Sequence, residues 1–455
     1  MRNLRNKISL SITVLILLSC FLGLKGNHNP ENYFGLLFMF FLFVKRSISV
    51  INFENPLIHL LKIALFFYVG IDFTLNIIFY YFFDYNVVLY KSNNPLIALF
   101  FALSALEISN LFLEYQKNIN HKITIQKKSL SLYLFLLLGL LNIYLVSIGY
   151  VGYGFDIKNS FGVNSLIRTF SSLFTPIVTI VSFIILFDQK NKITKNQKFI
   201  FNISIIIHIT FGFLSGMKET LLSFAFFYLI FYLKSGNVLN PKKISIIFIS
   251  LFILYPLNNS FRFLLNDSGL NMTRFEKFVV ATSYLNQSSI YESTNNYLNR
   301  LSLNENLFFA IDNEHLWKEY KHLDRYKYFI FHPFIPRFLW PGKPRLDIGQ
   351  KLYSLKTGRE TNSISPTTVG WSFLEGGYFY VFLIFFFLGI TLKLINLFKF
   401  KLSIFFLNYI ILLKLIKPEW DFYFFLTEII QTLLLIILLC VFLKISIINE
   451  SRSSI

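Results

Sequence analysis

The sequence predicts an all-α, polytopic integral membrane protein with about twelve transmembrane helices and one large extracytoplasmic loop. Of its 455 residues, 55% are hydrophobic, and the mean hydropathy is +0.56. These residues form repeated apolar runs, more than the core of a soluble domain would hold. Lys and Arg alternate between successive connections, as they do in multi-pass membrane proteins.

Apolar runs of the length expected for helices in a bilayer recur along the chain. We place the spans at approximately 8–24, 31–44, 60–83, 95–115, 131–152, 165–187, 199–215, 219–233, 244–260, 376–396, 403–416 and 422–444. The second, eighth and eleventh are the shortest.

Positive charge predicts the orientation of the spans. Arg2, Arg5 and Lys7 precede the first span and place the N-terminus in the cytoplasm. Every second connection after it is also rich in cations: Lys45 and Arg46; Lys117, Lys122, Lys127 and Lys128; Lys190, Lys192, Lys195 and Lys198; Lys234, Lys242 and Lys243; Lys399 and Lys401. We therefore predict two cytoplasmic termini. The abundance of Phe, Ile, Leu, Asn and Lys, which is typical of an AT-rich genome, predicts a bacterial inner membrane. The net charge of +19 is then explained by the cations that orient the spans, and we predict no nucleic-acid partner.

One connection is much longer and more polar than the others. It divides the chain into 1–260 with helices one to nine, the extracytoplasmic (periplasmic) loop 261–375, and 376–455 with the last three helices and a cytoplasmic tail. Long loops are uncommon unless they are functional. The residue spacing in 300–328 predicts that the loop is partly helical.

Several function classes lack their motifs. The chain contains no G-x-x-x-x-G-K-[ST], G-x-G-x-x-G, Asp-x-Asp or H-E-x-x-H pattern, which disfavours ATP-driven transport and nucleotide-sugar transfer. The two cysteines, Cys20 and Cys440, lie inside apolar spans and predict neither disulfides nor a metal site. We predict no cofactor and no metal.

The loop carries residues suited to a phosphate-bearing substrate. Its cations include Arg262, Arg274, Arg300, Arg337, Lys343, Arg345 and Arg359. Its acid–base groups include Glu292, Asp312, His315, His322, His332, Asp347, Glu360 and Glu375. Arginine binds two phosphate oxygens at once, and beside a bilayer the obvious anion is a lipid pyrophosphate. An attacking hydroxyl needs a carboxylate or an imidazole within reach.

Two short stretches present cations on the loop side of the membrane. In "HPFIPRFLWPGKPRLDIG" (332–349), prolines restrict the backbone around Arg337 and Lys343, with Trp340 as an interfacial anchor. The alternative is an ordinary amphipathic loop whose cations meet lipid headgroups. In "FGFLSGMKET", Lys218 follows a tight turn between two spans, as a functional cation or as a snorkelling lysine.

Ionisable residues also occur inside the apolar spans. They are Asp72, Glu107, His208 and Glu428. The first three are placed at mid-depth, where they can pair with one another. They form either a structural polar network or a path for substrate or protons.

Several stretches together resemble the Wzy-type O-antigen polymerases, which are oligosaccharide repeat-unit polymerases. These stretches are "FGFLSGMKETLLSF", "YLNRLSL" around Arg300, "IPRFLWPGKP", and "SPTTVGWSFLEGGYFYVFL" from Ser365 to Leu383. The matches fall in 211–224 and 297–390, and the topology of the whole chain is similar. The family often has Arg in place of Lys218 and Glu in place of Trp371.

The resemblance implies a metal-independent glycosyltransferase that joins repeat units of O-antigen, or of a related surface polysaccharide, on undecaprenyl pyrophosphate. Membrane lipid, a chain-length regulator and a flippase are the further partners it implies. Substrate contacts would come from Lys218, Arg300, Arg337, Lys343 and Arg345. The catalytic base stays open among His332, Asp347 and Glu375. An O-antigen ligase and a polysaccharide flippase or transporter are the alternatives, with a non-catalytic partner of the assembly machinery as a third.

Overall fold

The structure is a computed structural model of the 455-residue chain. It describes residues 56–65, 68, 94–109, 121–153, 163–187, 193–235, 257–258, 260–265, 272–283, 304–313, 315, 326–328, 331–332, 334–335, 339–340, 348–358, 363–398 and 402–449. The predicted spans 8–24 and 31–44 lie outside these residues. The described chain is mostly helical, as expected for the predicted fold class.

Five of the described helices are long and apolar enough to cross a membrane. They are α6 (Lys128–Ser147), α7 (Val163–Phe187, with its apolar window at Phe170–Phe187), α8 (Lys195–Leu214), α16 (Gly377–Leu397) and α18 (Phe422–Leu443). Each coincides with a predicted span, because an unbroken apolar run of this length has few other folds. The membrane-embedded character predicted from composition is thus supported, while the number of twelve spans stays a prediction.

Shorter helices complete the described part of the chain. They are α3 (Pro56–Leu65), α5 (Asn94–Ser109), α9 (Lys218–Lys234), α11 (Arg274–Ser283), α13 (Asn304–Asp312), α14 (Ile348–Thr357), α15 (Thr367–Leu374) and α17 (Leu402–Leu415). Four of them, α11 and α13 to α15, fall within the predicted loop. Its predicted boundaries stay a prediction.

Helices α6 and α8 run side by side in the same direction. At their starts, Gln197 Nε2 donates to Ser129 Oγ at 2.9 Å. At their ends, the Tyr153 N–H donates to the Ser215 carbonyl at 2.7 Å. A capping box between Thr194 and Gln197 begins α8. After the short turn that follows α8, α9 returns antiparallel to it.

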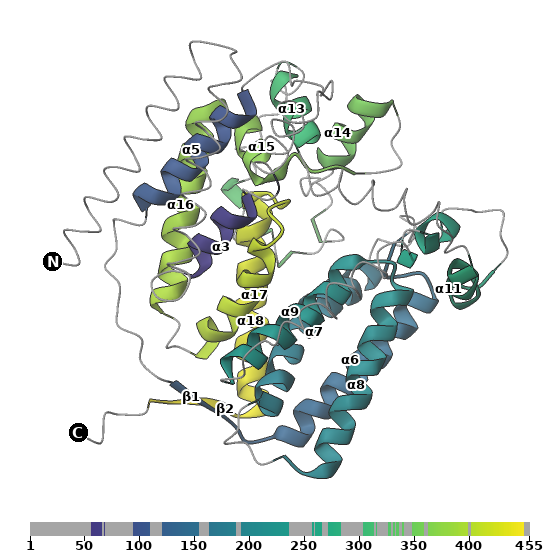
Figure 1. Cartoon of the computed structure of the whole chain (residues 1–455). Coiled ribbons are helices and arrows are strands. Elements are labelled where there is room, and N and C mark those ends of the chain that lie inside the picture. The colour runs from purple at the N-terminus through teal and green to yellow at the C-terminus, as the bar shows by residue number, and fades with distance from the viewer. Residues whose placement is uncertain are drawn as a thin grey trace, which may run out of the picture.

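A second group of helices packs around α16. Helix α5 lies along α16 (Figure 1), and their backbones approach closely at Gly389, where an added Cβ would meet Ser109. Small residues permit such close helix contacts in membranes. One apolar core joins this group to α6–α9, and α7 packs against both α17 and α18.

Two strands that the sequence did not predict form a small sheet. Strand β1 (His121–Ile125) pairs antiparallel with β2 (Ile445–Asn449), with Ile123 opposite Ile447. Both segments are short and rich in isoleucine, which favours β-pairing over helix. The described chain is otherwise helical, as the predicted all-α class requires, and this two-stranded sheet is the addition that the sequence did not predict.

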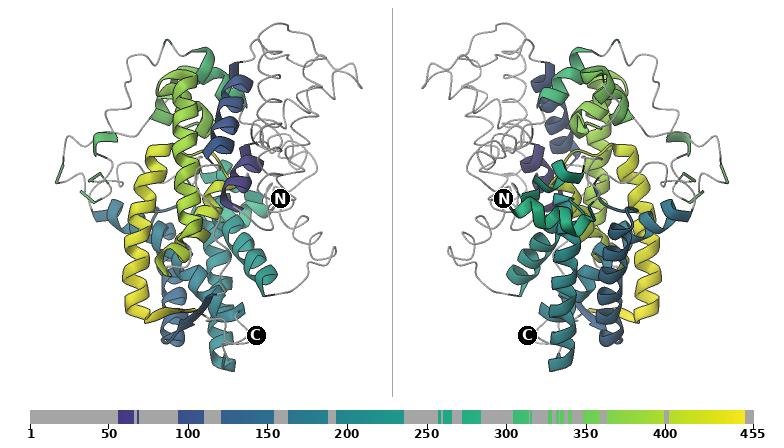
Figure 2. Two further views of the ribbon diagram at one scale, coloured as in Figure 1. Left: turned by 90° about the vertical axis from the view of Figure 1, so that its left-hand side faces the viewer. Right: turned by 90° about the vertical axis from the view of Figure 1, so that its right-hand side faces the viewer.

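The sheet marks one end of the molecule. Figure 2 shows the strands at the foot of the helices, and Figure 1 shows α11, α13, α14 and α15 away from them. We call these the strand end and the loop end. The C-terminal β2 thus lies beside 121–125, while the side of the membrane on which both lie stays a prediction.

The buried charges pair differently from the prediction. Glu107 forms an ion pair with Lys62 of α3, and His208 Nε2 lies 2.9 Å from the Phe135 carbonyl oxygen. The predicted pairing of Glu107 with His208 is therefore wrong, because α5 packs against α3 and α16 while α8 packs against α6. Asp72 lies outside the described residues. Glu428 pairs with Lys414 at 2.7 Å.

Candidate functional site at the loop end

The structure describes three of the eight residues predicted for the site. Lys218 is the first residue of α9, with its backbone alone described. His332 and Glu375 are described with their side chains. The predicted residues outside the described part of the chain are Arg300, Arg337, Lys343, Arg345 and Asp347.

His332 is seated against the start of α18. Its side chain is 7% exposed, and its ring lies edge-on to the rings of Tyr423 and Trp340, with centroids 5.5 Å and 6.3 Å away. Its backbone N–H donates to the Tyr328 carbonyl at 2.8 Å. The Tyr328 and Trp340 rings also meet edge-on, at 5.4 Å. An aromatic cluster thus attaches the proline-rich stretch to α18.

Apolar side chains around this cluster stay exposed. They include Phe331, which directly precedes the proline-rich stretch 332–349, and Phe334 and Leu339 within it. A monomeric soluble protein seldom exposes so many large apolar groups together. Exposed rings of this kind are typical of the boundary between lipid and water, where Trp340 was predicted to act as an anchor.

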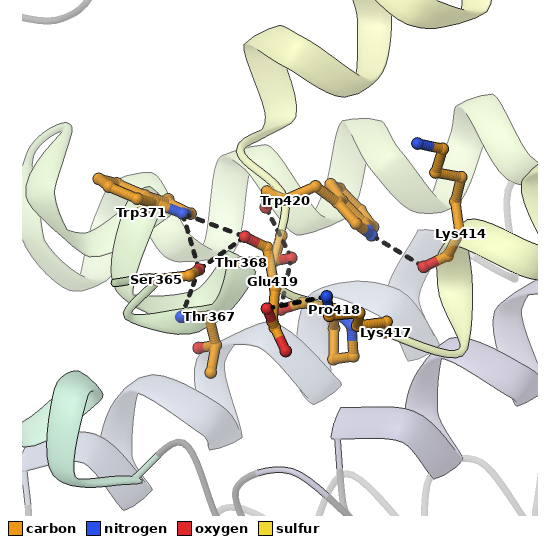
Figure 3. Close-up of polar contacts among 9 residues, drawn as sticks. All are labelled: Ser365, Thr367, Thr368, Trp371, Lys414, Lys417, Pro418, Glu419 and Trp420. Carbon is orange, nitrogen blue, oxygen red and sulfur yellow. Dashed lines mark hydrogen bonds and ion pairs between the residues drawn. The ribbon is translucent and has the colours of Figure 1, made fainter. Parts of the chain in front are cut away.

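Helix α15 is tied to the connection that leads into α18 (Figure 3). The Thr368 N–H donates to the Pro418 carbonyl at 2.8 Å. The Thr368 hydroxyl lies 3.1 Å from the same carbonyl oxygen and 2.9 Å from that of Trp420. Because Thr368 is fully buried, these bonds form where water does not compete.

A second set of bonds lies beside the first. Ser365 Oγ donates to the Glu419 carbonyl at 2.6 Å and accepts from the Trp371 indole N–H at 3.1 Å. The indole of Trp371 thus holds α15 to the connection before α18 (Figure 3).

The connection itself ends with a cap that the sequence signals. Asp421 Oδ1 accepts from the Tyr423 N–H at 2.9 Å and begins α18. The preceding Trp420 stacks on Phe425, with ring centroids 4.4 Å apart, and its indole donates to the Lys414 carbonyl at 3.1 Å. We did not predict a role for this connection, although an Asp directly before an apolar run is a typical helix start.

Glu375 ends α15 at the corner with α16. The preceding Leu374 packs with Ala310 of α13 and Leu352 of α14. Lys356 of α14 also pairs with Glu305 of α13 at 2.9 Å. These contacts gather α13, α14 and α15 at the corner, and α14 begins one residue after Asp347 in the sequence.

Two arginines of the predicted loop hold the turn between α8 and α9. Gly216 adopts a φ of +64° in this turn. Arg262 Nε donates to the Gly216 carbonyl at 2.7 Å, and its guanidinium lies 4.2 Å from the centre of the Tyr153 ring. Arg274 donates to the Tyr153 carbonyl at 2.9 Å and to the Leu214 carbonyl at 3.5 Å.

These contacts give both arginines a structural role. Burial lowers the pKa of the Arg274 guanidinium, but the ordinary pKa of arginine is so far above neutral pH that the group stays charged. Arg262 and Arg274 bind main-chain carbonyls rather than standing ready for phosphate. They fix the turn from which Lys218 begins α9.

The loop end thus combines an imidazole beside aromatic rings, a carboxyl group at a helix corner and a braced turn that ends in a lysine. In the residues described, no cluster of three His, Cys, Asp or Glu side chains is arranged to hold a metal ion. Comparisons with protein-family models, with curated proteins and with solved structures found no significant match.

Proposed function

We propose that this protein is a polymerase that joins undecaprenyl-pyrophosphate-linked repeat units into O-antigen or a related surface polysaccharide. The supporting observation is the place of the stretches that resemble the Wzy-type family. The turn before Lys218, the aromatic cluster around His332, and α15 are far apart in the sequence. All three lie at the loop end, away from the strands.

The proposed reaction transfers the growing glycan to an incoming lipid-linked unit on the outer face of the inner membrane. A base among His332, Asp347 and Glu375 takes the proton of the acceptor hydroxyl. The hydroxyl oxygen bonds to the anomeric carbon while the bond from that carbon to the pyrophosphate oxygen breaks. Undecaprenyl pyrophosphate leaves with the electron pair.

The leaving pyrophosphate gains negative charge, so the transition state is stabilised by nearby cations. We assign this role to Lys218 and to Arg300, Arg337, Lys343 and Arg345 of the loop. Among the rings of the cluster around His332, that of Tyr328 is exposed and supplies a flat apolar face for a sugar ring. Tyr423 and Trp340 also cover the imidazole, so His332 needs a sugar hydroxyl that reaches it past those rings.

A strain that lacks the gene tests the proposal through its lipopolysaccharide. A core that carries a single repeat unit, with no ladder of longer chains, is expected of a lost polymerase. A core with no repeat unit would contradict the proposal: it would indicate the ligase if lipid-linked polymer accumulates, and a flippase if it does not. An unchanged ladder would exclude the pathway altogether.

The site is tested by complementing that strain with single variants. Arg337→Ala should abolish long chains while the amount of protein in the membrane stays normal. Arg359→Ala, in the same loop and outside the assigned set, is the matched control and should restore the ladder. Normal chain lengths with Arg337→Ala would exclude the role given to this arginine.

A further inference from the structure

Helix α11 has three faces with different surroundings. One face packs on the protein: Arg274 binds the carbonyl of Leu214 at the end of α8 and that of Tyr153 after α6, Lys277 is buried, and Ala281 is fully buried. The ring of Phe278 lies between this face and the next, in contact with Phe213 and Phe261. Helix α11 is therefore held firmly against the end of α8.

A second face of α11 is apolar and exposed. Phe275 is 62% exposed and Val279 is 52% exposed. These two residues are four apart and share one face of the helix, and Met272, just before the helix, is also exposed. Phe263, on the helical segment 260–265, is 75% exposed.

The third face is polar and suited to water. The Glu276 carboxylate accepts from the Thr273 N–H at 2.7 Å and from the Thr273 hydroxyl at 2.9 Å. These bonds lower the pKa of Glu276, so the side chain is charged at neutral pH. A fully exposed carboxylate of this kind is costly in hydrocarbon.

The exposed apolar stripe of α8 leads directly to α11. Phe199, Ile206 and Ile209 are exposed along one side of α8, which is one of the helices apolar and long enough to cross a membrane. The next position on that side, four residues on, is Phe213, and the ring of Phe278 packs against it at 5.6 Å. Helix α11 thus sits where the lipid-facing side of α8 ends.

The level of α11 follows from the same contacts. Helix α8 has 20 residues, which span about 30 Å, the thickness of the hydrocarbon core. Arg274 reaches the carbonyl of Leu214, the last residue of α8. Helix α11 therefore lies near one boundary between hydrocarbon and water.

We propose that α11 is an interfacial helix, with Phe275 and Val279 inserted among the lipids of the bilayer and Glu276 turned toward water. Helices with a narrow apolar face and charged flanks bind membranes in this way. The bilayer is the occupant favoured here, because the apolar stripe continues the lipid-facing side of a membrane-crossing helix. The proposal does not depend on the proposed polymerase activity.

Nitroxide labels at single cysteines test this placement in the full chain. The background is Cys20→Ala/Cys440→Ala, reconstituted in phospholipid vesicles. Labels at Phe275→Cys and Val279→Cys should collide more often with oxygen, which concentrates in lipid, than with a water-soluble nickel chelate. The matched label at Glu276→Cys should show the opposite order. Its backbone N–H keeps the bond to the Thr273 hydroxyl, so α11 keeps part of its cap.

Two results would overturn the proposal. Higher collision with nickel at Phe275→Cys and Val279→Cys would place this face in water. Low collision with both reagents would show a cover of protein, such as a second copy of the chain. If a labelled variant aggregates, Phe275→Trp in the same vesicles replaces it: brominated phospholipid should quench its added fluorescence, and an absence of that quenching would overturn the proposal equally.

Discussion

Breaking the Lys62–Glu107 ion pair should be much more costly than removing it entirely. The Lys62 side chain is 0% exposed and the Glu107 side chain 13% exposed, so neither charge is well hydrated after its partner is lost. Leaving one such charge uncompensated costs about 3–5 kcal/mol. We expect Lys62→Met and Glu107→Gln each to lower the free energy of unfolding by about 3 kcal/mol. The double variant should cost no more than either single one, which gives a coupling energy of about 3 kcal/mol.

The assay is equilibrium unfolding of the purified protein in mixed micelles, with increasing SDS and tryptophan fluorescence as the signal. The Lys414–Glu428 pair is the matched control, because both of its side chains are about a third exposed. Its coupling energy should stay below about 1 kcal/mol. If the effects at Lys62 and Glu107 simply add, the pair does not stabilise the packing of α3 on α5, and our account of this contact is wrong.

Other contacts lead to smaller, local predictions. Gly152→Ala should destabilise the α8–α9 turn and lower the melting temperature, because Gly152 has a φ of +107° and a Cβ there would lie 2.8 Å from the Ser215 carbonyl oxygen. Asp421→Ala should lower the free energy of unfolding by about 1 kcal/mol, because it removes the cap of α18; SDS unfolding measures this, and an unchanged midpoint would contradict it. Arg274→Met should speed proteolysis near the turn, whereas Arg359→Met should leave the cleavage rate unchanged.

The long helices were predictable because hydropathy acts locally. The runs at 376–396 and 422–444 lead directly to α16 and α18, within one residue at each end. Membrane spans have this property because each must satisfy its own backbone hydrogen bonds. The alternation of Lys and Arg also agrees with β1 and β2 meeting at one end.

Contacts between distant segments were not predictable in the same way. Lys62 was not counted among the intramembrane charges, and its partner Glu107 was expected to pair within the set Asp72, Glu107 and His208, because depth in a span does not identify the neighbouring helix. The strand pair was missed because each strand needs a partner from the other end of the chain. Neither the basic, polar connection that contains β1 nor the short C-terminal segment that contains β2 carries a local sequence signal for this pairing.

Part of the candidate site was predictable from the sequence, and part was not. The turn before Lys218 was predicted from its glycines, and the structure places it between α8 and α9. Arg262 and Arg274 were interpreted as possible phosphate ligands, yet they bind main-chain carbonyls. The five N–H donors of a guanidinium can bind carbonyl oxygens as well as anions, so sequence does not tell the two uses apart. The contact of the His332 ring with Tyr423 arises from tertiary packing, and residue spacing in the sequence does not predict it.

The central claim is tested most directly with the purified protein in vesicles and lipid-linked repeat units as its only substrate. Our account predicts a ladder of longer lipid-linked glycans, with free undecaprenyl pyrophosphate released at each step and no lipid A core required. Arg359→Ala should give the same ladder, and Arg337→Ala should give none. Repeat units that stay unchanged until lipid A core is added, and are then transferred to it, would show a ligase and contradict the account.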